Sequence, residues 1–197
     1  YCPADQTYYT GEPYDGAWKT RRYNSLAGAS RTLGLAYLFT NDLRYAKQAA
    51  AILLLFTKRY LSHRYHDTLG GSRASGGRLL SQTLDESGWL LQLLAAYDAI
   101  AASGALSTAE QVDVEYNLLR PAVTTILRHD AGKSNWQAWH NAAVGATGYA
   151  LGEQKWIDHA LKGTHGFAYH MQQSVLPDGF WYEGSIGYHN YSLSAYQ

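Results

Sequence analysis

Apolar residues recur at helical spacing along almost the whole chain, and the segments with this spacing come in pairs. The spacing predicts helices over residues 25–39 and 42–60, 83–102 and 107–129, 135–151 and 154–174, with a further helix from residue 192. Short polar breaks such as Asn41-Asp42 separate the two members of a pair. A chain dominated by such helical hairpins is expected to fold as an all-α protein.

Local signals support the second hairpin. Thr83 with Glu86, and Ser107 with Glu110, have the spacing of a capping box, which predicts a helix start at each place. Pro121 predicts a kink or break in the helix that Ser107 opens, because proline lacks the backbone N–H that a helix interior uses.

The three hairpins form a weak internal repeat. The first helix of each is rich in small residues and ends near Tyr37, Tyr97 or Tyr149, and the second helix carries more charge. This predicts a crowded inner ring and a solvated outer ring, which is an (α/α) toroid or an arc of one. A plain helical bundle is the alternative. Residues 70–77 have no apolar period and predict a long surface loop between hairpins.

Composition sets the limits on function. The length of 197 residues and the 46% hydrophobic content suit one sizeable core, so we expect a single domain over residues 1–197. Sixteen acidic and sixteen basic side chains balance, which predicts no nucleic-acid partner and leaves any anionic ligand to local groups. The longest apolar run, residues 49–56, is too short for membrane insertion. Since the chain starts without methionine and stops within a predicted helix, we expect it to be a piece of a longer protein.

Aromatic residues point to a sugar ligand. Seventeen Tyr and six Trp stand against four Phe, and rings with a polar handle can stack on sugars while hydrogen-bonding hydroxyls. For any single ring, packing between helices is the alternative. Two blocks, residues 135–141 and 178–189, combine these rings with amide, imidazole and carboxylate groups.

The chain resembles polysaccharide lyases of the heparinase II/III and alginate lyase superfamily in motifs that follow the expected order. These are Tyr14-Asp15-Gly16 with Arg21 and Arg22, Gly77-Arg78-Leu79 with residues 82–86, the block 135–141 and the block 178–189. The resemblance implies an (α/α) toroid that is followed by a β-sandwich in the longer lyase. It also implies β-elimination on a uronate-containing anionic polysaccharide, of the heparin or heparan sulfate type or the alginate type.

The resemblance assigns three catalytic candidates. Tyr188 matches the catalytic tyrosine, which would move the proton between the sugar C5 and the leaving oxygen. Asn135 matches the group that neutralises the uronate carboxylate, and His140 is the competing candidate for that role. Asn135 and His140 are five positions apart on one helix, so we do not expect both to face the same sugar. Tyr191, one turn after Tyr188, is the fallback for the phenol.

Further residues are candidates for substrate binding, each with a structural alternative. The rings of Trp136, Trp139 and Trp181 can stack sugars or pack the core. Arginines can clamp carboxylates or stay solvated. Gln137 and Asn141 share a helix face. Glu183 can orient an arginine or histidine of the site, or remain a solvated loop carboxylate. The complete set is Gln137, Trp136, Trp139, Asn141, Trp181, Glu183, His189, Tyr191, Arg21, Arg22 and Arg78.

We predict no metal and no cofactor, because no cluster has convincing ligand spacing. His159, His165 and His170 are expected on the surface of an outer helix. The partners implied are an anionic polysaccharide or oligosaccharide and the remaining domains of the parent chain. The resemblance also implies a periplasmic or secreted protein.

Two other functions remain open. A glycoside hydrolase on a similar toroid would need carboxylates, for which Asp85, Glu86, Asp98, Asp178 and Glu183 are available. A non-catalytic carbohydrate-binding toroid would keep the aromatic rings and the arginines while the phenol of the catalytic tyrosine would be dispensable.

Overall fold

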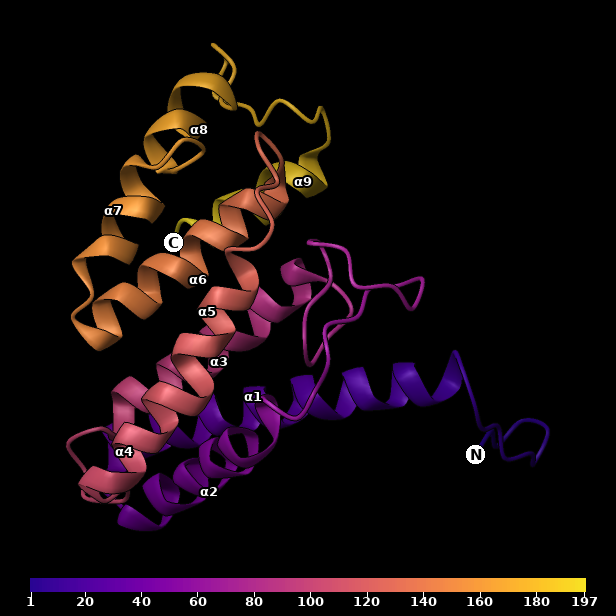
Figure 1. Ribbon diagram of the computed structural model, residues 1–197, viewed down its shortest axis with the longest axis vertical. Coiled ribbons are helices and arrows are strands. Elements are labelled where there is room, and N and C mark those ends of the chain that lie inside the picture. The colour runs from indigo at the N-terminus through magenta and orange to yellow at the C-terminus, as the bar shows by residue number, and fades with distance from the viewer.

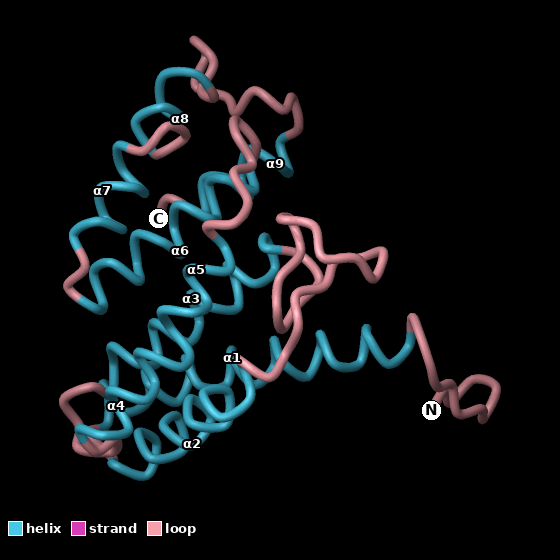
Figure 2. The backbone as a smooth tube through the Cα atoms, viewed as in Figure 1, coloured by secondary structure: helices cyan, strands magenta, loops and turns pink.

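The computed structural model describes residues 1–197, and all of its regular elements are helical apart from three isolated β-bridges. In chain order these elements are α1 (Tyr14–Thr40), α2 (Leu43–Tyr60), α3 (Thr83–Ile100), α4 (Thr108–Val114), the π-helical turn η1 (Glu115–Leu119), α5 (Arg120–Ile126), α6 (Asn135–Leu151), α7 (Gln154–Lys162), α8 (Phe167–Gln173) and α9 (Ile186–Ala195) (Figure 1). A long loop joins α2 to α3 (Figure 2).

Four helices form an inner row. Helix α1 packs against α3, α3 against α6, and α6 against α9, while α2 pairs with α1 and α7 pairs with α6. The four inner helices run in the same direction, so their N-terminal ends lie on one side, at the right of Figure 1. Alternating inner and returning helices make an arc of an (α/α) toroid, as predicted from the hairpin repeat.

Small residues bring the inner helices close together. A Cβ atom added to Gly34 of α1 would lie 3.1 Å from the Cβ of Ala99 and 3.3 Å from the Cα of Ala96, both on α3. Outside this contact, Trp89 of α3 stacks on Tyr60 of α2 with ring centroids 5.7 Å apart. Close helix approach and aromatic packing therefore join the first hairpin to the second.

A buried carboxylate ties the loop between α2 and α3 to the core. Glu86 is fully buried, and its carboxylate accepts hydrogen bonds from the backbone N–H groups of Arg78, Leu79 and Leu80 at 3.0–3.3 Å. The hydroxyl of Tyr60 donates a fourth, at 2.5 Å. Burial raises the pKa of Glu86, and these hydrogen bonds oppose that rise. The carboxylate thus joins α2, α3 and the loop.

The helix boundaries confirm part of the prediction. Helix α6 has the predicted bounds, Asp42 caps α2, and Ser107 with Glu110 forms the predicted capping box. The Thr83–Glu86 capping box is wrong, because Glu86 points into the core instead of back to its helix start.

Other boundaries differ from prediction. Helix α1 begins at Tyr14 rather than at residue 25, since its first part is helical yet mostly exposed and has no apolar period. The helix does not break at Pro121: η1 leads directly into α5, and Pro121 is the second residue of α5. Helix α9 begins at Ile186 rather than at residue 192.

The predicted helix 154–174 is two helices, α7 and α8. Gly163 and Gly166 separate them, and at each glycine a side chain would collide with backbone atoms of the preceding turn. The chain therefore turns tightly at this point, which brings the residues between the glycines against the start of α6.

We predict that Glu86→Leu lowers the free energy of unfolding by roughly 3–5 kcal/mol, because it leaves three buried N–H groups without an acceptor. Glu86→Gln keeps one acceptor oxygen and should cost about 1–3 kcal/mol. The exposed Glu12→Gln is the control and should stay within about 0.5 kcal/mol of wild type. Denaturant unfolding followed by far-ultraviolet circular dichroism measures all three. A fully stable Glu86→Leu protein would contradict the anchoring role.

Candidate functional site

The predicted catalytic residues lie at the N-terminal ends of two neighbouring inner helices. Asn135 is the first residue of α6, and Tyr188 lies in the first turn of α9. Helices α6 and α9 pack against each other, and both start on the side where the loops before α3, α6 and α9 gather (Figure 1). Backbone N–H groups at helix starts favour negative charge, so this side suits an anionic ligand.

Asn135 is held by Glu183. Both carboxylate oxygens of Glu183 lie 3.0 Å from Nδ2 of Asn135, and the backbone N–H of Asn135 donates to the same carboxylate at 3.1 Å. The indole N–H of Trp181 donates to it at 2.6 Å. Glu183 therefore orients an asparagine rather than the predicted arginine or histidine, and it is bonded rather than simply solvated. Its carboxylate occupies part of the anion-favouring position at the start of α6.

Behind this group lies a buried histidine. His170 is fully buried rather than on the surface as predicted, because α8 turns inward after the break at Gly163–Gly166. Its Nε2 donates to the carbonyl of Gly132 at 3.0 Å, and its Nδ1 accepts from the hydroxyl of Tyr196. The ring of Trp181 packs edge-on against it, with centroids 5.3 Å apart. His170 thus supports the indole that contacts Glu183.

Tyr188 is exposed and free to meet a ligand. Half of its surface is accessible and its hydroxyl makes no hydrogen bond within the chain. It lines a shallow pocket with Ser185, Gly187 and Tyr191. Tyr191 also packs against Trp139 of α6 with centroids 5.0 Å apart. Both phenols therefore sit at the junction of α6 and α9.

His189 has a different role from Tyr188 although the two are adjacent. Its Nδ1 accepts a hydrogen bond from the backbone N–H of Trp181 at 3.2 Å, and its ring stacks on Phe180. These contacts fix the segment that carries Glu183.

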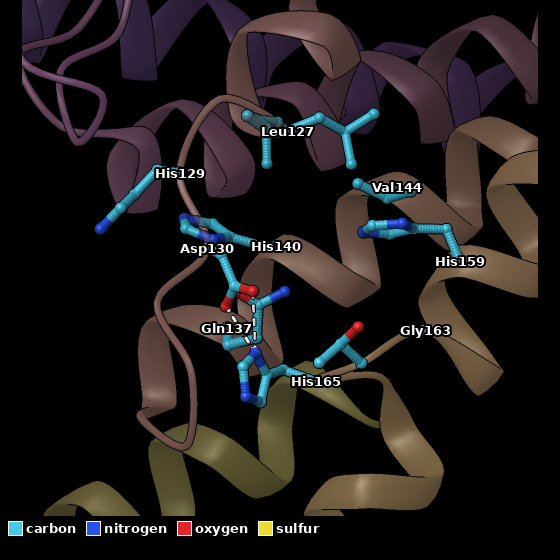
Figure 3. A pocket seen from close by; sticks show the side chains of 11 residues that line it. Leu127, His129, Asp130, Gln137, His140, Val144, His159, Gly163 and His165 are labelled. Atoms are coloured by element: carbon cyan, nitrogen blue, oxygen red, sulfur yellow. Dashed lines mark hydrogen bonds and ion pairs between the residues drawn. The ribbon is translucent and has the colours of Figure 1, made fainter.

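His140 faces away from Asn135, as the helical spacing predicts. It lines a cavity of about 200 Å³ with His129, Gln137 and His159 among others (Figure 3). The ring is 2% exposed, and neither nitrogen has a hydrogen-bond partner. Burial, with a smaller contribution from the nearby His129, lowers the pKa of His140 to about 3. The imidazole is therefore neutral and shielded, which makes it a weak group for neutralising a carboxylate.

Gln137 and Asn141 lie on one face, as predicted, and bond to each other at 3.0 Å. Gln137 Oε1 accepts from the N–H of Ala131, and Asn141 Nδ2 donates to the carbonyl of His165. These bonds attach the loop before α6 and the turn before α8 to the helix. Their carboxamides serve the scaffold, and their part in substrate binding stays a prediction.

The three tryptophans differ in exposure. Trp181 is 3% exposed and belongs to the support of Glu183, whereas Trp136 and Trp139 are partly exposed. The indole of Trp136 meets His129 edge-on at 5.6 Å. Trp136 and Trp139 are therefore the rings with surface left for a sugar.

The structure separates the predicted arginines. Arg21 and Arg22 lie on the exposed first part of α1, which extends away from α6 and α9 (Figure 1). Arg78 lies in the loop before α3, next to Tyr65 and Arg128. Sequence reasoning missed Tyr65 and Arg128, since neither stands in a motif and only the fold brings them together.

No group of three or more His, Cys, Asp or Glu side chains is arranged to hold a metal ion. None of the helices combines the length and apolar character needed to cross a membrane.

Fold and site together define an arc of an (α/α) toroid with amide, phenol and indole groups at one end of its inner row. The chain belongs to the alginate lyase family, whose family model matches residues 3–197. It is 31% identical over 175 residues to an exo-oligoalginate lyase of Saccharophagus degradans, a match that covers 84% of this chain and 23% of that protein. It is 29% identical over 184 residues to an alginate lyase of Stenotrophomonas maltophilia, covering 89% and 24%. The chain thus spans about a quarter of the length of these curated relatives.

The buried His140 predicts a pH dependence of stability. The folded protein keeps this imidazole neutral down to about pH 3, while the unfolded chain binds a proton below about pH 6.5. Stability should therefore fall as the pH drops below 6.5. We expect the loss between pH 7 and pH 5 to be smaller by roughly 2 kcal/mol in His140→Phe than in wild type. Denaturant unfolding at the two pH values measures it, and equal losses would contradict the neutral buried state.

Proposed function

We propose that the protein containing this chain is a polysaccharide lyase that cleaves a uronate-containing polysaccharide of the alginate type by β-elimination. The observation that carries the proposal is the placement of Tyr188 and Asn135 at the starts of two packed inner helices, in a chain of the alginate lyase family. The names of the two relatives, an exo-oligoalginate lyase and an alginate lyase, favour alginate over heparin or heparan sulfate. Placement in a wider superfamily with heparinases II and III is part of the same proposal.

The chemistry needs two groups that the site offers. Removing the C5 proton of a uronate is difficult while the adjacent carboxylate keeps its full charge, so a hydrogen-bond donor must stabilise the enolate-like intermediate. Asn135 is the donor and is preferred to His140. Both side chains are buried, but Asn135 lies at the start of α6, which packs against α9, whereas His140 lines a separate cavity with His129 and His159. Tyr188 is the exposed phenol that exchanges protons with C5 and with the leaving oxygen.

Glu183 sets the direction of the Asn135 amide. An amide nitrogen carries two hydrogens. Because both oxygens of Glu183 are equidistant from Nδ2, one hydrogen can be shared between them while the second points to a ligand. The negative charge of Glu183 disfavours a second carboxylate nearby, so the site needs cations close to Asn135 to bind a uronate.

The structure weakens the hydrolase alternative. Glu86 is fully buried and accepts four donors, so it cannot serve as an acid or base towards a sugar. Glu183 is already committed to Asn135 and Trp181. Asp85, Asp98 and Asp178 remain, and the product of the reaction distinguishes the two classes.

Location and further partners are also proposals. Polyuronates are extracellular polymers, so we propose a periplasmic or secreted protein. We further propose that the remaining parts of the parent protein complete the cleft beside α6 and α9, because the curated relatives are about four times longer than the matched region.

We predict that the parent protein releases products with a conjugated double bond from alginate, and that Tyr188→Phe lowers kcat by at least about 100-fold. Tyr149→Phe, on the exposed far end of α6, is the matched control and should retain wild-type activity. Ultraviolet absorbance of the double bond measures the reaction. Reducing ends without absorbance would indicate a hydrolase, and binding without any cleavage would indicate a carbohydrate-binding toroid.

A further inference from the structure

Two arginines enclose one tyrosine ring beside the candidate site. The guanidinium carbon of Arg78 lies 4.1 Å from the ring centroid of Tyr65, and that of Arg128 lies 3.6 Å from it. Two guanidinium groups this close to one ring centroid would collide with each other if they lay on the same face of the ring. We therefore infer that they stack on opposite faces. Such stacking uses the planar guanidinium in a way that lysine cannot reproduce.

Each guanidinium is also fixed by the backbone. Arg78 Nη1 donates to the carbonyl of His63 at 2.8 Å, and Arg128 Nη2 donates to the carbonyl of Ser72 at 3.3 Å. Both carbonyls belong to the loop before α3, which Glu86 anchors to the core. The two cations are therefore held in place without any ligand, which lowers the entropy lost when an anion binds.

Neither cation has a carboxylate partner. Arg120, which is also partly buried, forms salt bridges with Glu115 and Glu153. Arg78 and Arg128 form no salt bridge. Arg78 Nε and Arg128 Nη1 are shielded from solvent and make no hydrogen bond. The remaining nitrogens are Arg78 Nη2 and Arg128 Nε. They donate no hydrogen bond within the chain and are accessible to solvent. Each guanidinium group is thus partly removed from water, has no carboxylate partner and keeps an unused N–H donor. This combination indicates a binding position for an anionic ligand.

A short series of contacts connects the pair to the start of α6. Arg128 precedes His129, whose ring packs edge-on against Trp136, the neighbour of Asn135 on α6. His129 also bonds through Nδ1 to the hydroxyl of Thr83 at the start of α3, at 3.1 Å. His129, the residue after Arg128, therefore contacts both the start of α3 and the first turn of α6.

We propose that Tyr65, Arg78 and Arg128 form a binding subsite for the carboxylates of a polyuronate chain. This proposal rests on the proposed function. It deepens that function by naming a group of residues that recognises carboxylate charge and is distinct from Tyr188 and Asn135. A polyuronate carries one carboxylate on every sugar, so a sugar beyond the one at Asn135 presents its carboxylate to the free donors of Arg78 and Arg128. The subsite selects anionic over neutral oligosaccharides and offsets the repulsion from Glu183.

The test uses the parent protein with Tyr188→Phe to prevent turnover. Calorimetric titration with an alginate tetrasaccharide, and with the same tetrasaccharide after reduction of its carboxylates to alcohols, measures both affinities at low salt. We expect Arg128→Gln to weaken binding of the anionic ligand at least tenfold, about 1.4 kcal/mol, and to leave the neutral ligand within twofold. Arg128→Lys should give an intermediate loss of affinity for the anionic ligand, because lysine keeps the positive charge but lacks the planar, bidentate donor geometry of the guanidinium group.

A matched control and a second subsite variant accompany this test. Arg59→Gln removes the same charge from an exposed position near the end of α2 and should change neither affinity. Tyr65→Leu removes the ring between the cations and should weaken the anionic ligand selectively. In the active background, Arg128→Gln should raise KM at least tenfold and leave kcat within twofold.

The other outcomes are distinct. Unchanged affinity for the anionic tetrasaccharide in Arg128→Gln, or an equal loss for both ligands, would overturn the subsite and leave Arg128 a structural role. Selective weakening in a parent protein that binds alginate without forming unsaturated product would overturn the lyase function and support the subsite. A parent protein with no affinity for either ligand would overturn both.

Discussion

The buried carboxylate of Glu86 is the interaction on which the rest of this structure depends. Transferring a charge into the core is unfavourable unless it is fully hydrogen-bonded, and Glu86 meets that condition with three backbone N–H groups and the phenol of Tyr60. Tyr60 also bonds to Thr125 of α5, so one group joins two hairpins. Without this anchor the loop before α3 would not hold Arg78 in a fixed place.

Glu183 repeats the same device at the start of α6. It accepts from the first backbone N–H of α6, from the Asn135 side-chain amide and from the indole of Trp181, which packs against the buried His170. Glu86 and Glu183 thus both hold donor groups in place through their carboxylates. This arrangement favours chemistry by amide and phenol groups over chemistry by a pair of carboxylates.

The sequence predicted the parts of this structure that have a local cause. The hairpin repeat, the bounds of α6 and the Ser107 cap follow from apolar spacing and capping, and the structure has all three. The start of α1 has no apolar period, and the inward turn of Glu86 depends on contacts with α2 and on a loop that sequence spacing does not describe. The pairing of Asn135 with Glu183, and of Arg78 with Arg128 about Tyr65, joins segments 48 and 50 positions apart, by 183 − 135 and 128 − 78. Only the completed fold shows them.

Charge distribution makes the proposed binding of an anion compatible with equal numbers of acidic and basic residues. The net charge determines the electrostatic potential far from the protein. A bound ligand instead interacts with the charged groups that are left unpaired at the surface it contacts. On the side where the inner helices begin, Glu86 and Glu183 are each surrounded by donors, and Asp67 accepts backbone N–H groups and pairs with Arg73. Arg78 and Arg128 on that side have no carboxylate partner. Glu86, Glu183 and Asp67 are thus paired within the protein, while Asp85 in the first turn of α3 has no donor and Arg78 and Arg128 have no carboxylate partner. Local pairing, rather than overall composition, therefore determines the charge that a ligand would meet on this side.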